Sequence, residues 1–229
     1  MIVFVDNEHE KGYLKPWGEK LMAARLRIKY RLEDISGQPC LVVRYHHVTP
    51  DLLKKLDIQA ILVSGNGTAI TEYDPANLVG LRTVFQEKQW PTFGFCGGFQ
   101  LMAQTYGAEL APIGPLPADI THDPNDEVIL SPGMIQEFGY MPVHVQGQHP
   151  LLHKLGQAPV FRQAHSWEIK SLPSGFVNYA HTDVTPLQLI VHQELPLVGT
   201  QFHPEYYTDE HPAGRQLIEN FFTWAGVIT

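Results

Sequence analysis

Short apolar runs alternate with longer amphipathic segments through the first hundred residues of this chain. The runs are IVFVD, PCLVVRY, AILVSG and PTFGFC, and the segments between them are PWGEKLMAARLRIKYRLEDISG, TPDLLKKLD and PANLVGLRTVFQEKQ. The runs have the length of buried strands, and the segments repeat apolar residues at helical spacing. We expect the first helix to begin at Pro16 and to stop at Gly37. Strands separated by helices predict an α/β fold, a doubly wound, mostly parallel sheet with helices on both faces.

The second half of the chain is richer in predicted strands. Strand-like runs are YMPVHV, FVNYA, LQLIVH and LVGTQFH, and a final helix is expected from about Ala213 to Trp224. The segment 112–138 lies before them and is rich in Pro and Asp, which favours an irregular excursion over a lid or a partner surface. We expect a single domain over residues 1–229, with 112–138 as an insertion or loop excursion.

Composition and charge exclude several classes of function. The chain has 229 residues, 44% of them hydrophobic, and a formal net charge of −8 with no run of Lys and Arg, so nucleic acid is not an expected partner. The start of the chain lacks a basic signal-peptide region, and no later segment approaches the length of a membrane span. Twelve histidines are many for this length, but His46, His47, His149 and His153 lack the cysteine or carboxylate neighbours of a metal site. A cytoplasmic protein without metal, cofactor or membrane contact is expected.

Cys96 ends the run PTFGFC and is followed by two glycines. Ligands of an open parallel sheet lie outside the carboxyl ends of its strands, so this position is favourable for chemistry. The surrounding Gly94, Gly97 and Gly98 leave room for a sharp turn from strand to helix, and a helix N-terminus stabilises a thiolate and leaves N–H groups free. The corner alone favours a nucleophile and a buried core cysteine equally. Cys40, in QPCLVV, has no such surroundings and is expected in the core.

A cysteine nucleophile needs an imidazole within reach and a carboxylate that orients the imidazole. The stretch LVGTQFHPEYY places His203 just beyond an apolar run, where Pro204 prevents the strand from continuing. Glu205 is close enough in sequence to hold the ring in one tautomer. On its own this His-Pro-Glu would be interpreted as a surface turn.

Taken together, GFCGGFQLMA and GTQFHPE resemble the class I, or triad, glutamine amidotransferases. The nucleophile motif of that family reads Gly-x-Cys-x-Gly-x-Gln, and its base motif is His-Pro-Glu near the C-terminus. The matching positions are Gly94, Cys96, Gly98, Gln100, His203, Pro204 and Glu205. Weaker similarity covers IVFVDN, ILVSGNG, QAHSWEIKSLPSGF and the final helix, whereas 112–138 has no clear counterpart. The resemblance implies the flavodoxin-like fold of this family.

The resemblance also implies a reaction, the hydrolysis of glutamine to glutamate and ammonia. Cys96 would attack the γ-carboxamide carbon, and His203, oriented by Glu205, would give a proton to the leaving ammonia. The resulting γ-glutamyl thioester would be hydrolysed by a water that the same imidazole activates. The chain would need no cofactor.

Further residues take their implied roles from the same resemblance. The oxyanion would be held by the N–H of Gly97 and by one N–H of the turn at Gly65 and Asn66. Substrate binding would fall to Gln100 and to the backbone near Ser166 and Trp167. The turn departs from the Gly-Gly-Pro of the family, and Gly97 stands where a larger side chain is common, which would widen the pocket or loosen the oxyanion N–H. All three triad residues are present, so an active enzyme is expected.

Three functions are compatible with these residues. The first is a glutaminase that delivers ammonia to a separate synthetase, because a chain of this length leaves no room for a synthase domain. The second is a hydrolase of another γ-glutamyl amide or peptide that acts alone, which the two glycines after Cys96 and the segment 112–138 would suit. The third is a binding protein without catalysis, which the presence of Cys96, His203 and Glu205 argues against.

Overall fold

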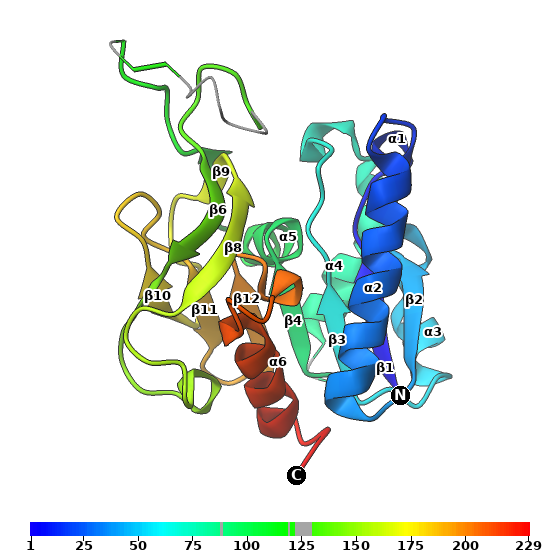
Figure 1. Ribbon diagram of the computed structural model, residues 1–229. Helices are drawn as coiled ribbons and strands as arrows, with labels where there is room; N and C mark the ends of the chain where they lie inside the picture. Colours follow the sequence, from blue (N-terminus) through cyan, green and yellow to red (C-terminus); the bar gives the residue numbers. More distant parts are fainter. Residues whose placement is uncertain (88, 119, 122–129) are drawn as a thin grey trace.

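The computed structural model describes residues 1–87, 89–118, 120–121 and 130–229. An eight-stranded sheet forms its centre, in the order β2-β1-β3-β4-β12-β11-β10-β7 (Figure 1). The parallel part consists of β2 (Cys40–Arg44), β1 (Ile2–Asp6), β3 (Ala60–Val63), β4 (Thr92–Phe95) and β12 (Leu197–Thr200). Antiparallel pairing then adds β11 (Leu189–His192), β10 (Phe176–His181) and β7 (His144–Val145). The predicted doubly wound, mostly parallel sheet is confirmed.

Helices cover both faces of this sheet. They are α1 (Glu10–Tyr13), α2 (Gly18–Ser36), α3 (Pro50–Lys54), α4 (Pro75–Gln86), α5 (Gly97–Thr105) and α6 (Ala213–Trp224). Every residue of β1 is buried, and its side chains alternate between two cores. Val3 and Val5 pack with α3, α4 and α5, whereas Ile2 and Phe4 pack with α2 and α6. This burial on both faces explains why the strand is a continuous apolar run.

The helix ends agree with the predictions at all but one position. The helix α2 begins at Gly18, because Pro16 belongs to a turn in which the N–H of Gly18 donates to the carbonyl of Lys15 at 2.8 Å. Its C-terminal cap is Gly37 with φ of 64°, as glycine allows. The final helix spans Ala213–Trp224, as expected. Single 3₁₀ turns lie at Tyr45–His47, Ile70–Glu72, Pro150–Leu152 and Pro204–Tyr206.

Two short ribbons stand beside the main sheet, and the sequence did not predict them. In one, β6 (Glu137–Pro142) pairs with β8 (Val160–His165), and in the other β5 (Leu110–Pro112) pairs with β9 (Trp167–Ile169). The run YMPVHV was expected to be one strand, but its first half lies in β6 and its last residues form β7 of the main sheet. Hydropathy along one strand does not reveal which neighbour it pairs with, so the split was not predicted.

The segment 112–138 is only partly described, because residues 119 and 122–129 lie outside the described ranges. Its two ends run side by side: the N–H of Leu116 donates to Gly133 at 3.0 Å, and that of Ile135 donates to Gly114 at 2.9 Å. The ends project above the sheet at the top of Figure 1. Among the described residues, no helix combines the length and the apolar character that crossing a membrane requires. A single domain over 1–229 stays a prediction.

One glycine sets how closely α6 approaches the turn that follows β12. A Cβ on Gly214 would lie 2.2 Å from the carbonyl oxygen of Pro204, which is backbone and cannot move aside cheaply. We expect Gly214→Ala to lower the free energy of unfolding by about 1–3 kcal/mol, measured by urea denaturation. Gly114→Ala is the control, because the nearest atom to its new methyl group is 3.8 Å away. Equal stability of the two variants would contradict this account.

Candidate active site

The loops that follow three parallel strands meet at one edge of the sheet. Cys96 follows β4, His203 lies three residues beyond β12, and the turn 64–68 follows β3. The N–H of Cys96 donates to the carbonyl of Thr200 at 2.7 Å, which ties the end of β4 to the end of β12. The structure therefore brings the predicted nucleophile and the predicted base to the same edge, where ligands of such sheets bind.

Cys96 occupies a strained corner between β4 and α5. Its φ is 45° and its ψ −106°, in a region that residues with a side chain rarely adopt. The helix α5 packs against the strands because glycines flank the corner: a Cβ on Gly94 would lie 2.7 Å from the carbonyl carbon of Gly98. A Cβ on Gly98 would lie 2.5 Å from the carbonyl oxygen of Val63. The expected crowding at this corner is confirmed.

His203 and the buried Glu205 form a hydrogen-bonded pair beside Cys96. The Nδ1 of His203 lies 2.7 Å from Oε1 of Glu205, whose side chain is 1% exposed. Burial disfavours the charged imidazole, but the negative charges of the Glu205 carboxylate and of a Cys96 thiolate outweigh burial and raise the pKa of His203 to about 10. A Cβ on Gly65 would lie 2.8 Å from Cε1 of His203 and 3.2 Å from Cβ of Cys96. Glycine at position 65 thus lets the imidazole and the thiol lie together.

The space left by the missing side chain of Gly97 is filled by Asn66. A Cβ on Gly97 would stand 1.6 Å from Oδ1 of Asn66, so the two positions share one volume. The Nδ2 of Asn66 donates to the carbonyl of Thr68 at 2.7 Å, and its Oδ1 accepts from Asn7 at 3.4 Å. The amide of Asn66 is therefore held in place. The expectation that Gly97 leaves a wider pocket is wrong, because the Asn66 side chain occupies that volume.

Free N–H groups face this corner from two elements. The first residues of a helix have no intrahelical acceptor, which leaves the N–H of Gly97 available to a ligand. The N–H groups of Gly65 and Asn66 have no hydrogen-bond acceptor among the residues that the structure describes. The nitrogen of Asn66 lies 3.0 Å from the place of a Cβ on Gly97. These groups form a set of backbone donors beside Cys96, an arrangement that can hold an oxyanion.

Gln201 is a site residue that the sequence reasoning missed. Its side chain is fully buried, and its Nε2 donates to Sγ of Cys96 at 3.6 Å. Its Oε1 accepts from Nε2 of Gln100 at 3.1 Å, and Gln100 also donates to the carbonyl of Trp167 at 2.9 Å. Gln100 thus faces the site as expected, and its amide nitrogen donates to Trp167 and Gln201. The signal that could have found Gln201 is its place two residues before His203, on the strand side of the turn.

Ser166 and Trp167 line the pocket that contains Cys96. The pocket has a volume of about 270 Å³, and Gly97, Asn66 and Gln100 also line it. The hydroxyl of Ser166 lies 2.8 Å from that of Ser131, so a described end of the segment 112–138 borders the pocket. The backbone carbonyls of Ser166 and Trp167 accept hydrogen bonds from Ile113 and Gln100.

A second buried pair, His165 and Glu137, supports this wall of the pocket. The Nε2 of His165 lies 3.1 Å from Oε2 of Glu137, and their side chains are 2% and 1% exposed. Burial disfavours the carboxylate, but the neighbouring His165, Thr182 and Thr185 outweigh burial and lower the pKa of Glu137. Oε2 of Glu137 also accepts from Nε2 of Gln188 at 2.9 Å. The pair keeps β6 and β8 in register directly before Ser166. No sequence pattern pointed to it, because its members lie 28 residues apart, at 137 and 165.

Comparisons with known proteins identify the family. The family model described as glutamine amidotransferase class-I matches residues 27–225. The chain belongs to the class-I glutamine amidotransferase family. A glutamine-hydrolyzing GMP synthase of Vibrio cholerae is 27% identical over 169 residues, which cover 74% of this chain and 28% of that protein. One subunit of the glutamine-hydrolyzing GMP synthase of Pyrococcus furiosus is 26% identical over 176 residues, 76% of this chain and 80% of that protein.

Solved structures agree with the fold of this amidotransferase. A protein of Thermoplasma acidophilum superimposes with a TM-score of 0.72 at 20% identity and covers 99% of this chain and 94% of its own. A glutamine amidotransferase of Thermotoga maritima superimposes with a TM-score of 0.66 at 13% identity and covers 100% of this chain and 99% of its own. At 20% and 13% identity, these superpositions show a shared fold and nothing further. The predicted family and fold class are confirmed.

The shared volume of Asn66 and Gly97 leads to a prediction about paired substitutions. Gly97→Ala should displace the Asn66 side chain and disturb the turn, lowering both the midpoint of thermal unfolding and any hydrolytic rate. Adding Asn66→Gly should recover a large part of both, because the amide that the methyl group meets is then absent. Rates and thermal midpoints of the two single variants and the double variant measure the coupling. Strictly additive effects would rule out a shared volume.

Proposed function

We propose that this amidotransferase hydrolyses the γ-carboxamide of glutamine to glutamate and ammonia through a thioester on Cys96. The observation that carries the proposal is the meeting of three groups at one strand edge. The ring of His203 and the Cβ that carries the Cys96 thiol both lie beside Gly65, 2.8 Å and 3.2 Å from the place of a Cβ there, and Oε1 of Glu205 lies 2.7 Å from Nδ1 of the ring. This order of nucleophile, base and orienting carboxylate is the arrangement needed for acyl transfer.

Each group has a defined role in the proposed mechanism. The thiolate of Cys96 attacks the amide carbon, and the oxyanion of the tetrahedral intermediate is held by the N–H groups of Gly97 and Asn66. The protonated ring of His203 gives its proton to the nitrogen as the C–N bond breaks, which releases ammonia and leaves the γ-glutamyl thioester. A water then gives its proton to His203 and attacks the thioester, so that glutamate leaves and the thiol is restored.

A separate synthetase is the proposed receiver of the ammonia. The relative from Vibrio cholerae is much longer, since the alignment covers 28% of it, whereas the relative from Pyrococcus furiosus is matched over 80% of its length. The description of the relative from Pyrococcus furiosus as one subunit of such a synthase supports a partner that acts in trans. The proposed location of both is the cytoplasm. Glutaminase activity should then rise when the partner is added.

One of the two arguments for the alternative, a γ-glutamyl hydrolase that acts alone, does not hold in the structure. It rested partly on a corner widened by Gly97, and the Asn66 side chain occupies that space. The described ends of the segment 112–138 border the pocket through Ser131, so the choice between glutamine and a larger γ-glutamyl compound depends on this wall. A panel of γ-glutamyl amides and peptides, compared with glutamine, separates the two functions.

The nucleophile is tested by comparing the two free cysteines. Cys96→Ala should abolish ammonia release from glutamine, whereas Cys40→Ala should leave it unchanged. Cys40 is a matched control because its thiol is buried in the core, where burial raises its pKa to about 12. Ammonia release is measured with a coupled assay, and mass spectrometry detects the thioester. Activity in Cys96→Ala would overturn the proposal.

The charge of Glu205 should set the alkaline limit of activity. Proton donation to ammonia needs the imidazolium of His203, which is present below its raised pKa and lost as pH rises through about 10. Glu205→Gln removes the carboxylate that favours the charged ring, so the alkaline limb of kcat/KM should move down by about one to three pH units. Glu210→Gln, which removes an exposed carboxylate five residues further along the chain, is the control. An unmoved alkaline limb would contradict the role of Glu205.

A further inference from the structure

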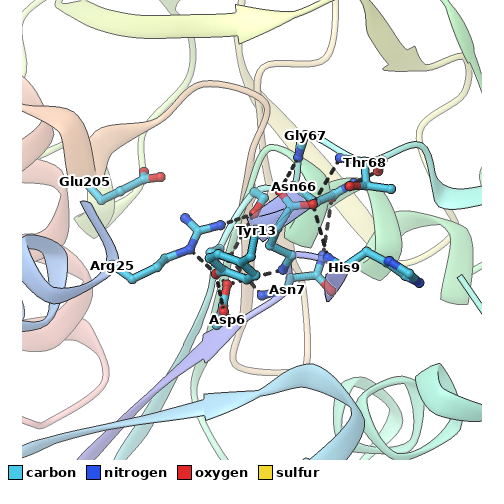
Figure 2. Close-up of polar contacts among 12 residues, drawn as sticks. Asp6, Asn7, His9, Tyr13, Arg25, Asn66, Gly67, Thr68 and Glu205 are labelled. Carbon is cyan, nitrogen blue, oxygen red and sulfur yellow. Dashed lines mark hydrogen bonds and ion pairs between the residues drawn. The ribbon is translucent and has the colours of Figure 1, made fainter. Parts of the chain in front are cut away.

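The turn 64–68 is held by two acidic side chains, one at the end of β1 and one just beyond it. Both oxygens of Glu8 accept from the turn, Oε2 from the N–H of Gly67 at 2.6 Å and Oε1 from that of Thr68 at 3.1 Å. Asp6 acts on the turn through Arg25 (Figure 2). Glu8 thus fixes the end of the turn at Gly67 and Thr68. The end at Gly65 is contacted by Arg25.

Arg25, on α2, connects Asp6 to the carbonyl of Gly65. Its Nε donates to Oδ1 of Asp6 at 2.9 Å, and its Nη2 donates to the oxygen of Gly65 at 2.9 Å. The side chains of Arg25 and Asp6 are 8% and 7% exposed, and Asp6 also accepts from the hydroxyl of Tyr13. Ser64 Oγ donates to the same carbonyl at 2.9 Å. A buried, planar guanidinium with two partners orients both of them.

The direction of the Gly65 carbonyl fixes the direction of the next N–H. A trans peptide is planar, and its C=O and N–H point to opposite sides. The described part of the chain contains no cis peptide bond. With the oxygen of Gly65 on Arg25, the N–H of Asn66 points away from α2, and its nitrogen lies beside Gly97 at the start of α5. That N–H has no acceptor among the described residues.

We propose that Arg25 is a positioning residue for the oxyanion site. It holds the Gly65 carbonyl on the α2 side of the turn, so that the N–H of Asn66 faces the oxygen of the amide that Cys96 attacks. If the peptide turned over, the partial negative charge of the Gly65 oxygen would face the developing oxyanion and repel it. The inference rests on the proposed function for its catalytic consequence, and the orientation of the peptide is independent of that function.

Arg25→Lys is the decisive variant. A lysine keeps the charge beside the buried Asp6, but its single nitrogen cannot donate to Asp6 and Gly65 in the geometry of a guanidinium. We expect kcat for glutamine to fall by at least about 10-fold and at most about 1000-fold, since removal of a whole oxyanion donor costs about 100- to 1000-fold. KM should change little, because the oxyanion exists only after attack. Ser64→Ala, which removes the second donor to the same carbonyl, should lower kcat less.

Alkylation of Cys96 by iodoacetamide separates positioning of the N–H from general damage. This displacement at a saturated carbon forms no oxyanion, so its rate in Arg25→Lys should equal that of the wild type while hydrolysis falls. Lys29→Met removes an ion pair with Glu33 on the surface of the same helix and should alter neither rate. A fall in alkylation parallel to that in hydrolysis, a raised KM with unchanged kcat, or an unchanged kcat would each overturn the inference.

A structural measurement tests the inference without glutamine turnover. A crystal structure of Arg25→Lys should show the peptide between Gly65 and Asn66 turned over in at least part of the molecules. A single, unchanged orientation would overturn the role of Arg25 even if the wild type hydrolysed no glutamine. Absence of ammonia release from the wild type, with the peptide turned over in the variant, would instead overturn only the proposed function.

Discussion

The site depends on how closely the backbone of α5 approaches the strands beneath it. Glycines at 94 and 98 bring the first turn of the helix against β3 and β4, within distances that a Cβ would prevent. That approach forces Cys96 into a positive φ at the corner and places the start of the helix beside the turn after β3. The nucleophile, the free N–H groups and the pocket are all consequences of this one contact between backbones.

Around that corner, polar side chains act mainly on the backbone. Glu8 and Arg25 bind N–H and C=O groups of the turn, and Gln201 connects the thiol to α5 through Gln100. Preorganised donors are useful in catalysis only if their direction is held before the reaction begins. The entropy lost in holding these donors in one direction is therefore lost when the protein folds, not when the reaction occurs. Burial and hydrogen bonds elsewhere in the fold offset that loss.

The sequence was most informative where the chain itself is periodic or where motifs are contiguous. The parallel half of the sheet, the final helix and the proximity of Cys96 to His203 followed from short apolar runs and from two motifs at strand ends. The pairing of β6 with β8 and the bridge from Arg25 to Gly65 did not, because they join residues roughly 20 to 40 positions apart whose register only packing decides. Pro16 failed as a helix start because a turn between α1 and α2 overrode its local preference.

The exchange of volume between Asn66 and Gly97 has a consequence for how the sequences of relatives are compared. Each position, taken by itself, departs from the usual pattern of the family and suggests a weakened site. Together they leave the packing beside Cys96 complete, because the amide at one position occupies what the other lacks. In an alignment, the two positions should therefore be compared as a pair. A relative with a large side chain after its cysteine needs a small residue at this position of the turn, and a relative with a large side chain in the turn needs glycine after its cysteine.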